Sequence, residues 1–395
     1  MIDKNEVVEL MKKLIAIPSP YFEEKKIMTF AGDWFKSHGM QASIHEYHEH
    51  KVTGHRGENI VLDMAGGRPG PTICINGHLD TVKLCNGWSV DPYAGVLDGD
   101  KIYGVGALDM KSGCAATMLA LKEFHARYKD DFKGRIIATY VSVEEGPYGM
   151  GTNALIEDGV IKDVDFSIVT EPSAGFAQEP FPTVCLGARG GYGLEIELFG
   201  KSSHAALPKN GKSAALDASK IVCELENVEY IKDEYLGTGA ACVVGLESDG
   251  GACSVPDYAK IKLFWHIVVG EDENTIRKEI EKAIKRAQIQ CEYKINFREA
   301  PSEGSKGFMP YTVSEEDPFV KDFIGSVKSI CGKEPVKAYF QSIGDFNYLG
   351  SRLDAPVVIF GAAGENFHSH DEYATISSIQ KTAEVVYDFL VKTLI

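Results

Sequence analysis

The sequence lacks the features expected of a membrane protein or a nucleic-acid-binding protein. No apolar run approaches the roughly 18 residues that suggest a membrane-spanning helix, so we expect no association with a membrane. The formal net charge of -16 argues against sequence-independent binding to nucleic acid, which requires a basic surface that displaces counterions. The chain begins like an amphipathic helix, with Asp3 before an apolar stripe, and not like a signal peptide.

The cysteines also lack an ordered pattern. All 9 are scattered, and none forms a C-x-x-C pair. Neither a disulfide framework nor a thiolate zinc site is therefore indicated, and we expect the reducing environment of the cytoplasm. With 395 residues, the chain exceeds the length at which a single hydrophobic core usually stops growing, so we expect two domains.

The apolar segments that are present alternate with helical patterns in the first part of the chain. The strand candidates NIVLDM and TICIN are followed by the helical segment GCAATMLALKEFHARY and a further strand, RIIATYV. This alternation is typical of a mostly parallel sheet with helices on its faces. We therefore predict an α/β domain with a mostly parallel sheet, formed by residues 1–177 and 297–395.

Near residue 180 the pattern changes. The segment GLEIELFG alternates strictly between apolar and acidic residues, as expected for a strand in a sheet with one solvated face. Helical segments and further alternating strands follow as far as EYKINF. This order predicts a small inserted α+β domain, ferredoxin-like in arrangement, over residues 178–296.

Acidic and imidazole side chains recur where predicted strands end. In GHLDTV, His78 and Asp80 are two residues apart and therefore project from the same face of a strand. A parallel sheet brings the carboxyl ends of its strands to one edge, where α/β proteins tend to place their sites. The other residues of this kind are Asp109 in GVGALDMKSG, Glu144 and Glu145 in VEEG, Glu171 in TEPS, and His368 and His370 in FHSHDEY.

So many carboxylates indicate bound cations. Like charges in one cleft raise one another's pKa, so all of these groups cannot stay ionised without cations. Imidazole and carboxylate ligands without thiolates suit zinc in an open catalytic site. Two histidines and three or four carboxylates are too many for one zinc that keeps a water position. The pattern favours two ions about 3.5 to 4 Å apart, with cobalt and manganese as alternatives to zinc.

Each residue taken alone also has an ordinary structural interpretation. His78 and Asp80 would suit a buried hydrogen-bonded pair, and Glu144 and Glu145 a solvated pair in a loop. Asp109 would suit the N-cap of a helix, a role compatible with metal binding. The combination of the motifs in one chain is what favours the metal site.

Six motifs in order carry a resemblance to a known family. GHLDTV, GVGALDMKSG, VEEG, TEPS, GKSSHAALPKNG and FHSHDEY resemble the co-catalytic zinc family of acetylornithine deacetylase, succinyl-diaminopimelate desuccinylase and glutamate carboxypeptidase. The resemblance covers nearly the whole chain, and it implies that the α/β domain is a catalytic domain with the fold of zinc aminopeptidases. It implies a metallohydrolase in which a metal-bridging hydroxide attacks an amide bond of a small N-acyl amino acid or short peptide. Dipeptides, N-acetylornithine, N-succinyl-diaminopimelate, N-carbamoyl compounds and other N-acyl amino acids all remain open as substrates.

The resemblance also implies a role for each residue of the motifs. Asp80 would orient His78, and Glu144 would be the general base that takes a proton from the water and delivers it to the leaving amine. The family's spacing to the glutamate of DEY selects His368 over His370. Five residues match the metal ligands: His78 and Glu171 for the first zinc, Glu145 and His368 for the second, and Asp109 bridging both.

Further expectations concern the predicted insertion, which mediates dimerisation in relatives. A histidine matching His204 reaches the partner's active site there and stabilises the carbonyl oxygen, so we expect a homodimer with a nearly inactive monomer. The alternative for His204 is an ordinary strand-end histidine. Arg189 in GARGG matches a substrate-carboxylate position of some relatives, with a structural salt bridge as the alternative. His266 stands where many relatives carry an arginine, which loosens the prediction of the substrate.

Other functions fit the sequence less well. A two-metal phosphoesterase would need a cluster of arginine or lysine residues for phosphate, which the motifs do not supply. A non-catalytic binding module of the same fold would have lost a ligand or the base, whereas all are present. Apparent phosphate-binding motifs fail, because the first glycine of a Walker A sequence would fall at Glu195 for FGKSS and at Ala206 for PKNGKS. The dinucleotide-like GVGALD has Asp109 in place of its third glycine.

Overall fold

The computed structural model describes residues 2–302 and 307–395, which form two compact units. The first unit contains Met1–Ala188 and Thr312–Ile395, and the second contains Arg189–Glu299. The connecting residues 300–311 are divided between them. The insertion was predicted to begin at residue 178, whereas strand β8 (Thr183–Ala188) pairs within the sheet of the first unit.

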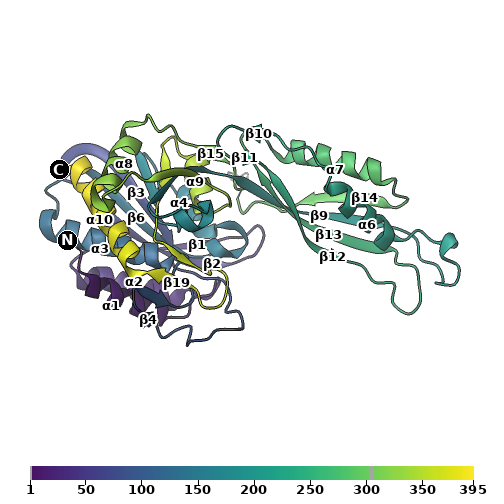
Figure 1. Cartoon of the computed structure of the whole chain (residues 1–395), viewed down its shortest axis with the longest axis horizontal. Helices are drawn as coiled ribbons and strands as arrows, with labels where there is room; N and C mark the ends of the chain where they lie inside the picture. Colours follow the sequence, from purple (N-terminus) through teal and green to yellow (C-terminus); the bar gives the residue numbers. More distant parts are fainter. Residues whose placement is uncertain (1, 303–306) are drawn as a thin grey trace. The chain divides into compact units, whose positions relative to one another are not determined.

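The first unit is built on one mixed sheet (Figure 1). Strand β3 pairs in parallel with β6 and β7, β7 pairs in parallel with β17, and β8 with β16. Strands β1 and β2 add an antiparallel edge. The predicted mostly parallel sheet is therefore confirmed. From the β1 edge the strands are β1 (Ala42–His48), β2 (Arg56–Ala65), β6 (Lys133–Val141), β3 (Arg68–His78), β7 (Phe166–Val169), β17 (Val357–Ile359), β8 and β15 (Tyr311–Thr312). Strand β16 (Val336–Phe340) lies off this path and pairs with β8.

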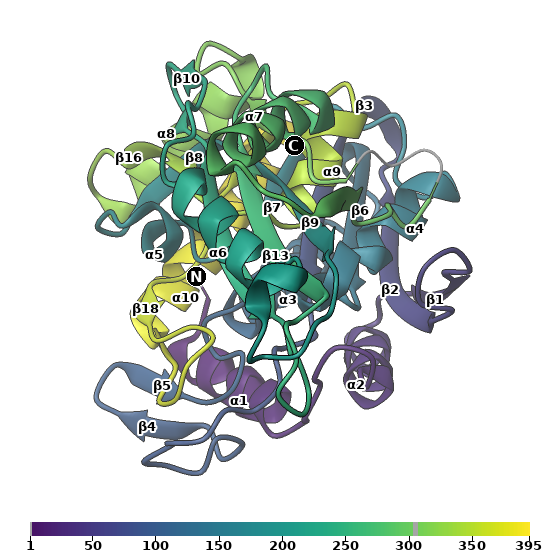
Figure 2. The same ribbon diagram turned by 90° about the vertical axis from the view of Figure 1, so that its right-hand side faces the viewer.

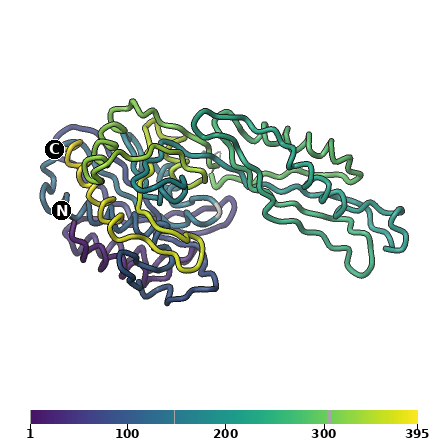
Figure 3. The backbone as a smooth tube through the Cα atoms, in the orientation of Figure 1, coloured from purple at the N-terminus to yellow at the C-terminus, as the bar shows by residue number. Residues whose placement is uncertain are grey.

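Helices cover this sheet because each presents an apolar face to it. In α1 (Lys4–Ile15), Asp3 caps the first turn, and the predicted stripe that includes Val7 and Leu14 is buried. Helix α3 (Lys111–Tyr128) is buried along most of its length and packs against α10 (Ile376–Leu394). Helix α1 also contacts α10, so the N-terminal and C-terminal segments lie side by side, as the purple and yellow parts of Figure 3 show.

The second unit is a four-stranded antiparallel sheet with two helices. The strand order β12 (Ala240–Glu247), β13 (Tyr258–Ile267), β9 (Gly190–Phe199), β14 (Glu292–Phe297) and the β-α-β-β-α-β succession give the predicted ferredoxin-like arrangement. Helices α6 (Ala214–Leu225) and α7 (Glu273–Ala287) lie side by side on the strands (Figure 2).

Alternation along these strands sorts their side chains. Ile196 of β9 pairs with Ile261 and is fully buried. Glu195 projects to the opposite face, where it bonds Lys260 at 2.7 Å. Among the residues that the structure describes in either unit, no helix combines the length and the apolarity needed to cross a bilayer.

Candidate metal centre

The predicted ligands of the first unit lie at neighbouring strand ends. β3 ends at His78 between its parallel neighbours β6 and β7, so the segments that carry Glu144, Glu145 and Glu171 emerge at the same edge. Glycine permits the approach of the segment that carries Asp109, because a Cβ atom at Gly113 in α3 would lie 2.1 Å from the carbonyl oxygen of Thr170. Parallel topology and one close helix therefore assemble the site.

His78 is the centre of a first group of donors. Its Nε2 atom lies 3.3 Å from Oδ1 of Asp109 and 3.3 Å from Oε1 of Glu171. All three side chains are buried, His78 almost completely. One imidazole nitrogen and two carboxylate oxygens thus face a common point.

His368 is the centre of a second group. Its Nε2 atom lies 2.9 Å from Oε2 of Glu145 and 3.4 Å from Oδ2 of Asp109. The two oxygens of Asp109 therefore face different histidines. Ligand atoms of His78, Asp109 and Glu145 also lie within 4.8 Å of one another, which is close enough for the three side chains to bind one metal ion. The donors are nitrogen and oxygen only, and this set suits zinc in an open site.

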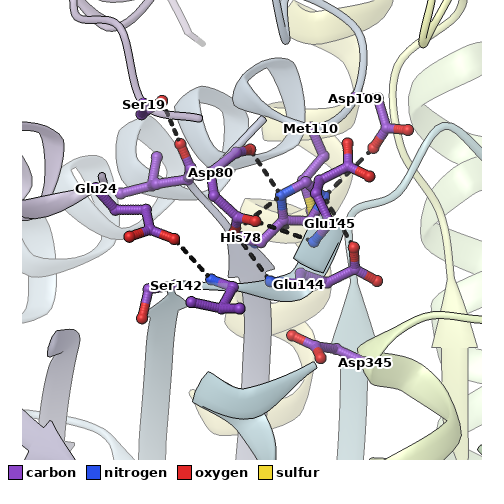
Figure 4. A network of polar contacts seen from close by, with 12 residues as sticks. Ser19, Glu24, His78, Asp80, Asp109, Met110, Ser142, Glu144, Glu145 and Asp345 are labelled. Carbon is purple, nitrogen blue, oxygen red and sulfur yellow. Dashed lines mark hydrogen bonds and ion pairs between the residues drawn. The ribbon is translucent and has the colours of Figure 1, made fainter. Parts of the chain in front are cut away.

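Asp80 contributes in a way that the sequence did not reveal. Its carboxylate accepts hydrogen bonds from the backbone N–H groups of Glu144 at 3.1 Å and Glu145 at 2.9 Å (Figure 4). The Nδ1 atom of His78 is closer to the backbone carbonyl oxygen of Asp80, at 3.0 Å, than to its carboxylate, at 3.6 Å. Asp80 thus contacts the ring of His78 and also holds the segment that carries the two glutamates.

The segment of Glu144 and Glu145 is held from a second side by Glu24. The Oε1 atom of Glu24 accepts a hydrogen bond from the N–H of Val143 at 3.1 Å. Val143 has a φ of 58°, in the left-handed region. Two buried carboxylates, Asp80 and Glu24, therefore fix a turn that a β-branched residue rarely adopts unaided.

Excess negative charge dominates the site. Burial, together with the nearby Asp109, raises the pKa of Glu171 to about 8. Hydrogen bonds to Asp109 and Glu145 raise the pKa of His368 to about 11. Burial also raises the pKa of Glu144 well above its ordinary value, against the opposing effect of His78. Glu171, His368 and Glu144 therefore hold protons that offset the negative charge of the site. Two divalent cations would neutralise the same charge.

Asp345 is a buried acidic residue that none of the sequence motifs predicted. It begins α9 (Asp345–Arg352), and its Oδ2 atom accepts a hydrogen bond from Thr152 Oγ1 at 2.7 Å. Burial raises its pKa to about 6. Figure 4 shows its carboxylate on the Glu144 side of the cluster. The available signal was its position just after strand β16, at the start of a helix.

His370 does not join the cluster. Its Nδ1 atom lies 3.5 Å from Oδ2 of Asp371, and its ring lies against Gly87. The loop between β18 (Gly364–Glu365) and β19 (Tyr373–Thr375) thus brings His368, and not His370, to Glu145 and Asp109.

Two predicted residues belong to the second unit. His204 is exposed, and its Nδ1 atom accepts a hydrogen bond from the N–H of Ala206 at 3.1 Å. Arg189 is half-buried and donates from Nε to the carbonyl oxygen of Leu236 at 3.1 Å. Burial and the nearby Arg189 lower the pKa of His266 to about 4, so this imidazole is neutral. The catalytic role of His204 and the substrate-binding role of Arg189 remain predictions.

Known proteins resemble this chain over nearly its whole length. The profile of Peptidase family M20/M25/M40 matches residues 74–392. Succinyl-diaminopimelate desuccinylase of Sulfurovum sp. (strain NBC37-1) is 25% identical over 384 residues, which cover 96% of each chain.

Solved structures show the same fold. A tripeptidase from Staphylococcus aureus superposes with a TM-score of 0.79 at 20% identity, covering 100% of this chain and 99% of that one. A dinuclear metal-binding peptidase of the M20 family from Bacillus subtilis superposes with a TM-score of 0.73 at 14% identity, covering 98% and 97%. The predicted resemblance is confirmed, and the chain belongs to Peptidase family M20/M25/M40, as a metal-dependent hydrolase.

Proposed function

We propose that this protein is a di-zinc hydrolase that cleaves an amide bond of a small N-acyl amino acid or a short peptide. The observation that carries the proposal is the geometry of Asp109, whose two oxygens face two separate pairs of an imidazole and a carboxylate. A bridging carboxylate between two such pairs is the arrangement that a two-metal hydrolase needs. Family membership supports the same reaction class.

The described side chains suit two ions. His78 and Glu171 would hold one, Glu145 and His368 the other, and Asp109 both. When bound, two zinc ions would lower the pKa of a shared water and polarise the amide carbonyl. Cobalt or manganese would suit nitrogen and oxygen donors too.

Glu144 is the group best placed to move protons. Its Oε2 atom lies 3.9 Å from Nε2 of His78, at the edge of the first donor group. Its backbone is fixed by Asp80, and its largely buried side chain is shielded from bulk water. We assign Glu144 as the general base that accepts a proton at its carboxylate and later donates it to the leaving amine.

The substrate proposal draws on relatives and on the second unit. Desuccinylase relatives cover nearly the whole chain, which favours an N-acyl amino acid over a longer peptide. Arg189 would bind a substrate carboxylate, and His204 would donate a hydrogen bond to the carbonyl oxygen as it becomes negative. An N-carbamoyl compound, which presents a similar carbonyl, is the alternative substrate.

A homodimer is part of this proposal. Among the described strands, β12 pairs with β13 alone and is the edge of its sheet. Val244 and Leu246 of β12 are 62% and 48% exposed, an unusual apolar content for a free edge. A second copy pairing along β12 would cover it. Val244→Asp should then yield a monomer in analytical ultracentrifugation, with activity lost if His204 acts across the interface.

A substrate panel with metal control tests the function. N-acetyl and N-succinyl amino acids, dipeptides, an N-carbamoyl amino acid and a phosphodiester are incubated with the zinc-loaded protein and with the chelated protein. We expect chelator-sensitive hydrolysis of at least one N-acyl amino acid or dipeptide. Hydrolysis of the phosphodiester alone, or two bound zinc ions without turnover of any amide, would contradict the proposal.

A further inference from the structure

Glu372 is a buried carboxylate outside the proposed ligand set. It lies four residues after His368 in the chain, and its side chain is shielded from solvent. Its Oε1 atom accepts hydrogen bonds from the N–H groups of Leu108 at 2.8 Å and Asp109 at 3.0 Å, and its Oε2 atom accepts from Gly106 at 2.9 Å. One carboxylate thus binds three backbone donors in the segment that carries the bridging ligand.

The backbone around Glu372 strengthens this connection. Its carbonyl oxygen accepts a hydrogen bond from the N–H of Gly104 at 3.0 Å. The next residues form β19 (Tyr373–Thr375), which pairs antiparallel with β5 (Lys101–Tyr103). The segment before Asp109 is therefore bonded to the chain that follows His368 through both the side chain and the backbone of Glu372. Asp109 and Glu372 are 263 positions apart in the sequence.

We propose that Glu372 is a positioning residue that sets the separation between Asp109 and His368, and so controls affinity for the ion that these two side chains share. This inference rests on the proposed two-zinc function. Hydrogen bonds from N–H groups to a carboxylate are stronger than those to a neutral acceptor. A displacement of the Asp109 peptide moves its carboxylate relative to His368, because the side chain of Asp109 has only two rotatable bonds.

The two ions should not depend on Glu372 equally. His78 is the last residue of the central strand β3, and Glu171 closely follows β7, so the parallel sheet positions them without Glu372. His368 lies in a loop with a φ of 59° and is partly exposed. The ion held by Glu145 and His368 should therefore be the more sensitive one.

Glu372→Gln tests the inference. The amide keeps the size of the side chain, but its NH2 group cannot accept a hydrogen bond and would face one of the three backbone donors. Zinc affinities are measured by competition with a chromophoric chelator, and the absorption bands of the cobalt-loaded protein report the coordination of each ion. We expect about 10- to 100-fold weaker binding of the second ion, a change of less than about threefold for the first, and altered cobalt bands.

Glu365→Gln is the matched control. Glu365 is exposed in β18 of the same hairpin, so this change removes an equal charge without touching the Asp109 segment. Its zinc affinities should stay within about threefold of those of the wild type, since an exposed charge is screened. If Glu372→Gln also stays within that range and its cobalt bands do not change, the positioning role is overturned.

Hydrogen exchange keeps the inference testable if Glu372→Gln does not fold. In the wild-type protein without metal, the amides of residues 106, 108 and 109 should exchange much more slowly than in an unstructured peptide. Exchange at the unprotected rate would overturn the role of Glu372. If the wild-type protein binds fewer than two zinc ions, the proposed two-zinc function is overturned instead. Hydrogen exchange at residues 106, 108 and 109 then still decides whether Glu372 holds the Asp109 segment.

Discussion

The two units use the same charged residue types in opposite ways. On the solvated face of the second unit, Lys260 lies 2.7 Å from Glu195 and Lys262 bonds Glu247, so each carboxylate has its own cation. In the first unit, Asp109 and Glu171 are buried and the Glu145 side chain is 7% exposed, and the cations nearest to these carboxylates are imidazoles. Paired carboxylates at a surface stabilise little, whereas buried carboxylates that outnumber the nearby imidazoles indicate a site for cationic ligands.

The largest expected effect concerns the proposed base. Glu144→Gln removes the proton acceptor without removing a proposed ligand, so kcat should fall by about 10²- to 10⁴-fold while two zinc ions stay bound. Glu195→Gln on the solvated face is the control and should keep kcat within about twofold, since exposed pairs contribute little. Metal content by atomic emission and kcat on the best substrate check both. Nearly normal turnover by the Glu144→Gln enzyme would contradict the assignment of Glu144 as the general base.

The next effect concerns the bridging ligand. Asp109→Asn removes the charge that both donor groups share, so we expect at most one tightly bound zinc. Metal at 1,000 times its Kd stabilises a protein by about 4 kcal/mol for each site, so the zinc-dependent rise in thermal midpoint should fall by about half or more. Asp98→Asn, at an exposed position in β4 (Val96–Asp98), should keep that rise. An undiminished rise in the Asp109 variant would show that zinc binds elsewhere.

A smaller effect concerns Asp345 in the metal-free protein. Burial raises its pKa to about 6, so the folded state holds this proton more firmly than the unfolded chain does. The stability that the proton provides is present below the unfolded pKa of about 4 and is lost as the pH rises through 6. Asp345→Asn carries no such charge and should exceed the wild type by up to about 3 kcal/mol at pH 8.

Urea unfolding of the chelated proteins at several pH values measures this difference. The stability gap between Asp345→Asn and the wild type should widen between pH 4.5 and pH 7 and then stay constant. A gap that does not change with pH would mean that Asp345 is not a source of buried charge in the folded state.

The smallest effect is expected on the surface sheet of the second unit. Lys260 and Glu195 form a partly exposed pair at 2.7 Å, so Lys260→Met should change the free energy of unfolding by less than about 1 kcal/mol. Salt should reduce the difference further, because exposed charges are screened. Denaturant unfolding at low and high ionic strength measures it. If Lys260→Met lowered the free energy of unfolding by several kcal/mol, the surface pairs of the second unit would not be weak, and the difference from the buried carboxylates of the first unit would be lost.

Many helices and strands could be predicted from the sequence, because side-chain periodicity is a local property of each segment. Period-two alternation in GLEIELFG predicted a strand with one solvated face, and Ile196 is indeed buried while Glu195 bonds Lys260. The continuous apolar run TVCLG gave no such signal, and β8 was placed in the insertion although it pairs in the first unit. A buried strand looks alike in either domain, because only its pairing partners differ.

The sequence by itself determined the element types, their order and the chemistry of the donor side chains, since side-chain period and residue type are local properties. Only the tertiary structure decided which oxygen of Asp109 faces which histidine, that the Asp80 carboxylate holds Glu144, and that Glu372 binds the Asp109 segment. These contacts join residues that lie from 31 to 263 positions apart in the chain. Such pairings depend on how the sheet and its loops close in space, which no local pattern specifies.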